Sequence, residues 1–387
     1  MCTLDRLYSC KFLEHSSGSP TEMWVMHDRE KLYYCKTHIE NHSKTGGVAY
    51  EADVYEYLTE KLKGSVYGAY NFVPVFCVLR GQKLDDLLKL VNSSSRTFLV
   101  KAYNYFFGEA KITEVHCPQE NQEVTLEQLA KSLLASTSDQ KKPLLNQRPF
   151  VDNENLVEKA NNFHYTVVVT ESSGDTSKTL LDFYTENSGN TPMLMCLLSR
   201  LVLSIHKLHN LGVSHNDMHW DNVLVREHDK VDLNYTLSPR DKGYKEKKFQ
   251  YEQIQVSPVL FDWDRAEMKV GRSNPELKEY EQLYEPPFSP GRDFCHFLRN
   301  WTDHAKDVYA PIAHKTQEEY KNLSGRNIEV LESLLQPSCL EEPKDIYRPE
   351  EKTWDQVFDI NIDNDKFVLA LVYVMKSYCI IGKRKRR

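Results

Sequence analysis

The first 80 residues alternate between short β-rich runs and one amphipathic segment. Aromatic and β-branched residues gather at 23–28, 31–39 and 72–78, which predicts three strands. Between the second and third runs, apolar side chains recur four positions apart in residues 49–62, which predicts a helix. We therefore expect a small sheet that accompanies a single helix.

Residues 81–160 break this pattern. They are rich in Ser and Asn and contain two helix-like stretches, near 84–91 and 126–134, without compact apolar alternation. Such a stretch is typical of a peripheral insertion between core elements. The run YTVVV at 165–169 returns to the pattern of a buried strand.

A long helix is predicted at 192–212. Pro192 near its start and Gly212 at its end are typical entry and exit residues. Its apolar side chains follow three- and four-residue steps on one face: Leu194, Leu197, Leu198, Leu201, Ile205 and Leu208.

The order of elements predicts an α+β protein with two lobes. The first lobe, 1–171, is expected to be a small antiparallel-sheet lobe with one helix and the insertion at about 81–160. The second lobe, 172–387, is expected to be larger and mainly helical, with an insert at about 227–255 and a basic C-terminal tail.

Composition fits a globular chain: of 387 residues, 40% are hydrophobic and 27% are charged. The net charge of -7 gives no general attraction to nucleic acid, so such binding is expected only through the basic tail 383–387. That tail is compatible with nuclear import, a nucleic-acid contact or a solvated end, and we rank nuclear import slightly ahead of a solvated end.

The cysteine pattern and the apolar segments bear on location. Nine cysteines without a C-x-x-C pair favour reduced thiols in a cytosolic or nuclear compartment over a disulfide framework. The N-terminal residues lack the apolar region of a secretory signal. The apolar run 367–374 is far shorter than a membrane span, so we expect a buried closing helix rather than a tail anchor.

Candidate chemistry is concentrated in the sequence HNDMHWDN at 215–222. Phosphoryl transfer from ATP needs a carboxylate near the attacking hydroxyl and oxygen ligands for magnesium. Asp217 and Asn222 are five positions apart on one predicted loop, and Asp262 follows a predicted strand end in LFDW. These three residues predict a base and a magnesium site.

This combination resembles the signature of eukaryotic-type protein kinases, in which H-x-D and Asn precede an apolar strand that ends in Asp. The resemblance implies a two-lobed kinase fold with ATP and Mg²⁺ in its cleft. Asp217 would be the catalytic base, and Asn222 and Asp262 would hold the metal. Lys36 resembles the strand lysine that binds the ATP phosphates, and Glu51 resembles its partner on the following helix.

Further positions follow from the same resemblance. Glu171 and Ser172, after the YTVVV strand, would form the hinge that meets adenine, and Asp293 resembles the buried Asp that binds the catalytic-loop backbone. Gly18 is the single glycine in the region of the glycine-rich loop, and a phosphate-binding glycine and an ordinary turn glycine are equally compatible with it.

Two assignments have rivals nearby. Glu56 lies on the same predicted helix as Glu51 but lacks the downstream apolar pattern, and Lys31 precedes the strand that carries Lys36. His215 is interpreted as a structural residue beneath the loop.

Within the kinases, the loop is most similar to haspin-like atypical Ser/Thr kinases, which carry a D-L-H-W-x-N loop, and to divergent kinases of large DNA viruses. The sequence DMHWDN at 217–222 carries this resemblance. His219 replaces the Lys of ordinary protein kinases, as it does in aminoglycoside and choline kinases. A phosphate contact and a loop-shaping hydrogen bond both remain open for it.

Two departures from the family pattern affect regulation. Asn216 replaces the usual Arg, so we expect little dependence on activation-loop phosphorylation. Trp263 and Asp264 replace Phe-Gly after the metal-binding Asp, which should stiffen that segment.

We therefore predict a Ser/Thr protein kinase that uses ATP and Mg²⁺. The alternatives are a small-molecule kinase, which the His219 pattern favours, and a pseudokinase scaffold, which the poor glycine loop favours. The resemblance leaves the protein substrate unknown, with a chromatin-associated protein as a candidate, and predicts no membrane partner. The expected location is the cytoplasm or nucleus, and for a viral protein that of the host cell.

Overall fold

The computed structural model describes residues 11–16, 22–28, 31–39, 48–82, 165–171, 178–238, 245–275, 277, 287–326 and 364–379. The chain forms two compact units. The first consists of Met1–Glu56 and Pro74–Ser172, and the second of Tyr57–Val73 and Ser173–Arg387. Gly18, Ser172, the tail 383–387 and nearly all of the insertion expected at 81–160 lie outside the described residues.

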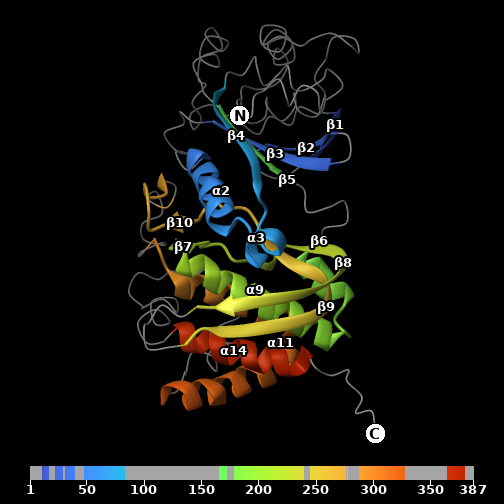
Figure 1. The fold of residues 1–387 in the computed structure, drawn as a ribbon, viewed down its shortest axis with the longest axis vertical. Helices are drawn as coiled ribbons and strands as arrows, with labels where there is room; N and C mark the ends of the chain where they lie inside the picture. The colour runs from blue at the N-terminus through green and yellow to red at the C-terminus, as the bar shows by residue number, and fades with distance from the viewer. Residues whose placement is uncertain are drawn as a thin grey trace, which may run out of the picture. The chain divides into compact units, whose positions relative to one another are not determined.

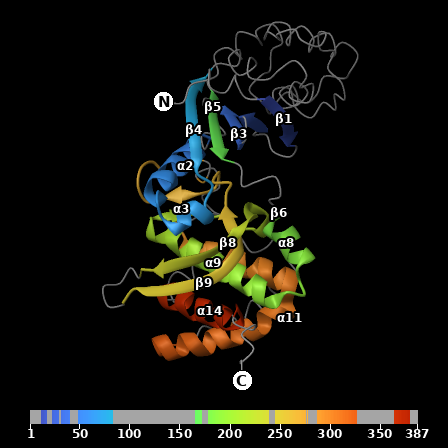
Figure 2. The same ribbon diagram turned by 45° about the vertical axis from the view of Figure 1, so that its right-hand side comes forward.

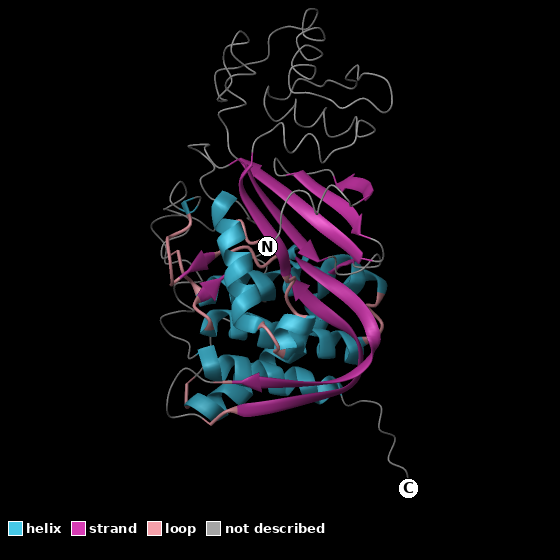
Figure 3. Ribbon diagram, turned by 45° about the horizontal axis from the view of Figure 1, so that its top comes forward, coloured by secondary structure: helices cyan, strands magenta, loops and turns pink. Residues whose placement is uncertain are grey.

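The first unit contains a five-stranded antiparallel sheet in the order β1-β2-β3-β5-β4, visible in magenta in Figure 3. Its strands are β1 (Lys11–Ser16), β2 (Glu22–Asp28), β3 (Lys31–Ile39), β4 (Val75–Gln82) and β5 (Tyr165–Glu171). The last strand in sequence, β5, pairs with β3 on one side and β4 on the other. Its run Val167, Val168 and Val169 is buried, which explains why this segment is continuously apolar.

Helix α2 (Val48–Leu62) begins in the first unit and ends in the second. Tyr50, Val54 and Leu58 recur every four residues and are buried, so the amphipathic pattern in the sequence corresponds to the packed face. The short helix α3 (Val66–Tyr70) follows and begins at Ser65, whose Oγ accepts a hydrogen bond from Gly68 N at 3.1 Å.

The second unit carries two small sheets. One has the order β6-β8-β9, formed by β6 (Lys178–Thr179), β8 (Val223–Leu237) and β9 (Lys247–Leu260); the other pairs β7 (Val213–Ser214) with β10 (Glu267–Met268). The insert expected at about 227–255 is thus largely a β-hairpin. Leu233, Tyr235 and Leu237 are buried at every second position, which is the period of one strand face.

Helices account for most of the other described residues of this unit. They are α8 (Leu180–Glu186), α9 (Thr191–Asn210), the 3₁₀ turn η3 (Trp220–Asn222), α11 (Pro290–Ser324) and α14 (Asn364–Cys379). Helix α14 packs against both α9 and α11, and the β8–β9 hairpin lies beside α9 (Figures 1 and 2). An ion pair of 2.6 Å between His206 Nε2 and Asp365 Oδ1 links α9 to α14. Helix α11 is bent at Ala305, where φ is -152° and ψ is 52°.

The apolar helices have buried faces. Phe367, Leu371 and Met375 of α14 are buried, as expected for a closing helix. Among the described helices, α9 alone is long and apolar enough to span a bilayer, and 72% of that stretch is buried within the protein. Burial of this kind is typical of a core helix in a packed domain.

The α+β class is confirmed: an antiparallel sheet with its helix forms one unit, and helices dominate the other. One cysteine departs from the expectation of reduced thiols, because Cys77 in β4 is disulfide-bonded. Among the described residues, Cys196, Cys295 and Cys379 are free thiols.

Candidate active site

The loop 215–219 of the second unit is fixed by one buried carboxylate. Asp293, in the first turn of α11, is fully buried. Its Oδ2 accepts a hydrogen bond from His215 N at 2.8 Å, and its Oδ1 accepts one from Asn216 N at 2.7 Å. His209 Nε2, at the end of α9, lies 2.8 Å from Oδ2. This single side chain therefore holds the loop backbone between two helices.

The surroundings of Asp293 favour its charged form. Burial acts to raise the pKa of its carboxyl, but the hydrogen bond and charge of His209, together with the charge and backbone N–H of His215, lower that pKa below its ordinary value. Asp293 is therefore a carboxylate at neutral pH, and its bonds to the loop are charge-assisted.

Asn216 is a structural member of the loop. It is fully buried, and its backbone has φ of 62°, a left-handed conformation that Asn tolerates better than most residues. Its Nδ2 donates to the carbonyl oxygens of Arg265 at 3.0 Å and Pro287 at 2.8 Å, and its Oδ1 accepts from Arg292 Nη1 at 2.9 Å. Asn at this position thus joins three segments, and the buried guanidinium nearby comes from Arg292 on α11.

Asp217 lies at the turn of the loop and is 9% exposed. Its Oδ1 is 3.0 Å from His219 Nε2 and 3.2 Å from Arg265 Nη1, although neither contact is an aligned hydrogen bond. Its Oδ2 lies 3.3 Å from Asn222 Nδ2. Oδ1 therefore sits beside two basic groups and keeps a lone pair for a further donor.

The neighbours of Asp217 keep it ionised. Burial acts to raise the pKa of its carboxyl, but the close contact with His219 and the charges of Arg265, His219 and His215 lower that pKa to about 2. The carboxylate is therefore a proton acceptor over the whole neutral range.

Asn222 and Asp262 supply oxygen donors of the kind that magnesium prefers. Asn222 Nδ2 donates to the backbone oxygen of Asp217 at 2.9 Å as well as facing its carboxylate, which leaves the amide oxygen as the atom available to a ligand. Asp262 lies two residues after the end of β9, and its φ of 65° is left-handed. Strained backbone at a non-glycine residue is common at functional sites. The donor set fits Mg²⁺ by its chemistry.

The segment after Asp262 is firmly packed. Trp263 is buried between Phe72, at a ring-centroid distance of 5.9 Å, and His215, at 4.7 Å. His215 Nε2 also lies 2.9 Å from the carbonyl oxygen of Phe261, to which it donates. His215 thus has the structural position expected of it, and the packing agrees with a stiff segment here.

In the first unit, Lys36 of β3 and Glu51 of α2 form an ion pair. Lys36 Nζ lies 3.0 Å from Oε1 and 2.9 Å from Oε2 of Glu51, whose side chain is fully buried. The rival Glu56 instead pairs with Arg80 at 2.6 Å and is half exposed. The structure therefore joins Lys36 to Glu51, as the sequence pattern predicts, and separates Glu56 from this role.

The nucleotide-binding positions are described only in part. Glu171 ends β5, and its backbone N–H donates to Pro74 O at 3.2 Å. Gly18 and Ser172 lie outside the described residues, so their assigned roles stay predictions.

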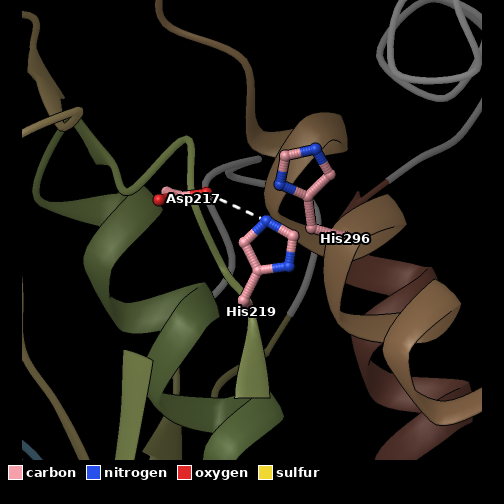
Figure 4. Close-up of side chains that lie close together, drawn as sticks. All are labelled: Asp217, His219 and His296. Carbon is pink, nitrogen blue, oxygen red and sulfur yellow. Dashed lines mark ion pairs between the residues drawn. The ribbon is translucent and has the colours of Figure 1, made fainter. Parts of the chain in front are cut away.

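Two residues near Asp217, His296 and Asn300, were not predicted as site residues from the sequence. His219 is half exposed, and its ring stacks on His296 of α11 at a centroid distance of 5.3 Å. Asn300, one turn further along α11, has its Nδ2 3.3 Å from His219 Nδ1. Figure 4 shows the two imidazoles beside the Asp217 carboxylate. His296 and Asn300 lie about 80 positions from the loop and have no motif of their own, so only the fold reveals them.

Comparison with known proteins leaves the family open. No protein-family model matches the chain, and no curated protein matches it. Among solved structures, it overlaps with "WaaP in complex with acyl carrier protein" at TM-score 0.35 and 10% identity, covering 79% of this chain and 78% of that one.

Two further overlaps are with the PF14_0431 kinase domain and with the Rad53 kinase domain and SCD2. The PF14_0431 kinase domain overlaps at TM-score 0.38 and 11% identity, covering 97% of this chain and 90% of its own. The Rad53 structure overlaps at TM-score 0.32 and 13% identity, covering 95% of this chain and 97% of its own. At these scores the overlaps carry no argument about function, which must come from the side chains themselves.

Proposed function

We propose that this protein is an ATP-dependent kinase that transfers the γ-phosphoryl group to Ser or Thr hydroxyls of a protein substrate. The observation that carries the proposal is the arrangement around Asp217. An ionised carboxylate is presented on a loop whose backbone is fixed by the buried Asp293. Asn222 Nδ2 donates to the backbone oxygen of Asp217 at 2.9 Å and to its carboxylate at 3.3 Å.

Each residue has a role that its surroundings support. Asp217 Oδ1 orients the acceptor hydroxyl and takes its proton, because that oxygen has no aligned donor of its own. Asn222 and Asp262 would hold Mg²⁺, which when bound neutralises charge on the phosphates. We assign Lys36, oriented by the buried Glu51, to binding of the ATP phosphates.

A radiolabelled ATP–Mg²⁺ assay with casein and histone as acceptors tests the proposal. We expect labelling of a protein by the wild type and none by Asp217→Asn, which keeps the side chain's shape but removes its charge. Asp303→Asn, an exposed substitution on α11, is the matched control and should label as the wild type does. Equal labelling by wild type and Asp217→Asn would reject Asp217 as the base.

A small-molecule kinase is the second candidate, and one observation favours it. His219, which replaces the Lys of ordinary protein kinases, contacts the Asp217 carboxylate at 3.0 Å. If folded protein labels no polypeptide, a panel of aminoglycosides, choline and sugars becomes the acceptor set. Transfer to one of these that is lost in Asp217→Asn would establish this second function, whereas ATP binding without any transfer would indicate a pseudokinase scaffold.

The finer assignments extend the proposal. The DMHWDN loop supports placement near haspin-like kinases or kinases of large DNA viruses, and a chromatin-associated substrate would follow from the former. We also propose that the tail 383–387 directs the protein to the nucleus. Loss of nuclear accumulation when those residues are deleted tests this, and an unchanged distribution would remove the tail from the argument.

A further inference from the structure

Three potential metal ligands meet on one side of the catalytic loop. Asp217 and His219 come from the loop, and His296 comes from the first half of α11. One ligand atom from each lies within 4.8 Å of the other two. Figure 4 shows both imidazoles on the same side of the carboxylate and marks the Asp217–His219 ion pair with a dashed line.

His296 has a polar atom that the protein itself does not use. Its Nδ1 is buried and has no hydrogen-bond partner, whereas buried polar atoms are normally paired. An unpartnered imidazole nitrogen beside a second imidazole and a carboxylate requires an explanation.

We propose that Asp217, His219 and His296 form a binding site for a divalent transition-metal ion, with Zn²⁺ as the best-fitting ion. Two imidazole nitrogens and one carboxylate oxygen are ligands that suit Zn²⁺, and three protein ligands with an open fourth position are a common arrangement for it. Tetrahedral ligands about 2.0–2.2 Å from zinc are roughly 3.3 Å from one another.

The required adjustment is small. The Asp217–His219 contact is already 3.0 Å, so only the approach of His296 must shorten. His219 is half exposed and can rotate. When zinc occupies its Nε2, the ring proton is on Nδ1, which can donate a hydrogen bond to the amide oxygen of Asn300 after that side-chain amide turns over.

This site differs from the magnesium site in its ligands. Mg²⁺ prefers oxygen atoms and binds imidazole poorly, so Asn222 and Asp262 would take magnesium while the His-containing site selects zinc. Zinc on Asp217 Oδ1 would occupy the lone pair assigned to the substrate proton. Zinc bound at this site would therefore inhibit phosphoryl transfer. This consequence rests on the proposed kinase function, whereas the binding of the metal does not depend on it.

One neighbouring charge opposes the ion. Arg265 Nη1 lies 3.2 Å from the same Asp217 oxygen, so zinc must displace a half-exposed guanidinium. Removal of this charge should tighten binding by about 30-fold, the factor expected for a unit charge and a divalent ion near 4 Å in water-like surroundings. Arg265→Gln thus provides a variant that shifts affinity in the opposite direction from loss of a ligand.

Zinc binding to the full-length protein is measured by competition with a chromophoric chelator, and Co²⁺ absorption reports the coordination geometry. We expect His296→Gln and His219→Gln to lower the affinity for the most tightly bound zinc ion by more than about 10-fold. Loss of an outer-shell partner alone lowers metal affinity by roughly 10- to 100-fold, and loss of a direct ligand should cost at least as much. His314→Gln, an exposed histidine on the same helix, should leave it unchanged. Thermal unfolding of each variant verifies that it is folded.

The outcomes separate the two proposals. Two results would overturn the metal site whatever the kinase activity. One is equal zinc affinity in the wild type and His296→Gln, and the other is loss of the tightly bound zinc ion in His314→Gln. A tight site that needs His219 and His296 supports it even if no phosphoryl transfer is found, in which case only the kinase proposal fails. If transfer is found, inhibition by zinc should weaken by the same factor as binding in His296→Gln.

Discussion

Replacement of Asp293 by Asn tests whether one buried carboxylate organises the catalytic loop. The carboxylate accepts from His215 N at 2.8 Å and Asn216 N at 2.7 Å and pairs with His209 at 2.8 Å. An amide keeps one accepting oxygen and turns an NH₂ toward a donor. At least one backbone N–H then loses a charge-assisted bond of about 1.5–3 kcal/mol, and the remaining bonds weaken by roughly 1 kcal/mol each.

The free energy of unfolding of the second unit should therefore fall by about 3–5 kcal/mol, in the range found when a buried ion pair is broken. For a unit of roughly 200 residues, this lowers Tm by about 10 °C. Tryptophan fluorescence reports the change, because Trp220, Trp263 and Trp301 are fully buried in this unit. Phosphoryl transfer should fall as well, since the backbone beside Asp217 loses its anchor.

The effect has a defined pH dependence. The folded-state pKa of Asp293 is lowered, so its stabilisation is complete above the ordinary Asp value of about 3.9 and is lost as pH falls through the lower folded value. The difference in Tm between wild type and Asp293→Asn should thus be largest at neutral pH and shrink in acid. Asp303→Asn, on the exposed side of α11, is the control. A Tm within about 1 °C of the wild type at pH 7, with transfer intact, would refute the reasoning.

Three further predictions concern the remaining site residues. Lys36→Met should abolish transfer and lower the free energy of unfolding by about 3–5 kcal/mol, because the buried Glu51 loses its ion pair with Lys36. Addition of Glu51→Leu should recover stability in chemical unfolding but should not recover activity. Recovered activity would refute the assignment of Lys36. Asn222→Ala should raise the Mg²⁺ concentration needed for half-maximal transfer by roughly 10- to 100-fold, and an unchanged requirement would exclude it as a ligand. Phosphatase treatment should leave activity intact, since Asn216 is fully engaged in hydrogen bonds within the fold; a collapse of activity would contradict this.

Local chemistry in the sequence was a good guide to the candidate site. Asp217 and Asn222 were predicted to supply a base and a metal ligand from one loop, and in the structure Asn222 Nδ2 donates to the backbone oxygen of Asp217 at 2.9 Å. The resemblance to protein kinases implied the pairing of Lys36 with Glu51, and in the structure both carboxylate oxygens of Glu51 lie near the ammonium. These arrangements are readable because each depends on short loops and on the period of a helix or strand.

The hairpin of β8 and β9 was harder to read. Its arms are hydrophilic on one face, so the composition of this segment predicted only an insert. Leu233, Tyr235 and Leu237 nevertheless alternate with polar residues, as in a half-buried strand. The opposing strand β9 and helix α9 cover that face, and these tertiary contacts explain why the alternating residues are buried.

The sequence by itself determined the α+β class, the long buried helix α9 and the residues that carry the proposed chemistry, because these follow from periodicity and from motifs within a few positions of one another. Only the tertiary structure decided that Arg265, Arg292, His296 and Asn300 surround the loop. The places of Arg292, His296 and Asn300 depend on how α11 packs beside a loop about 80 residues earlier in the chain, and that of Arg265 depends on the segment after β9. Contacts of that separation arise from the burial of whole faces, which no local pattern encodes.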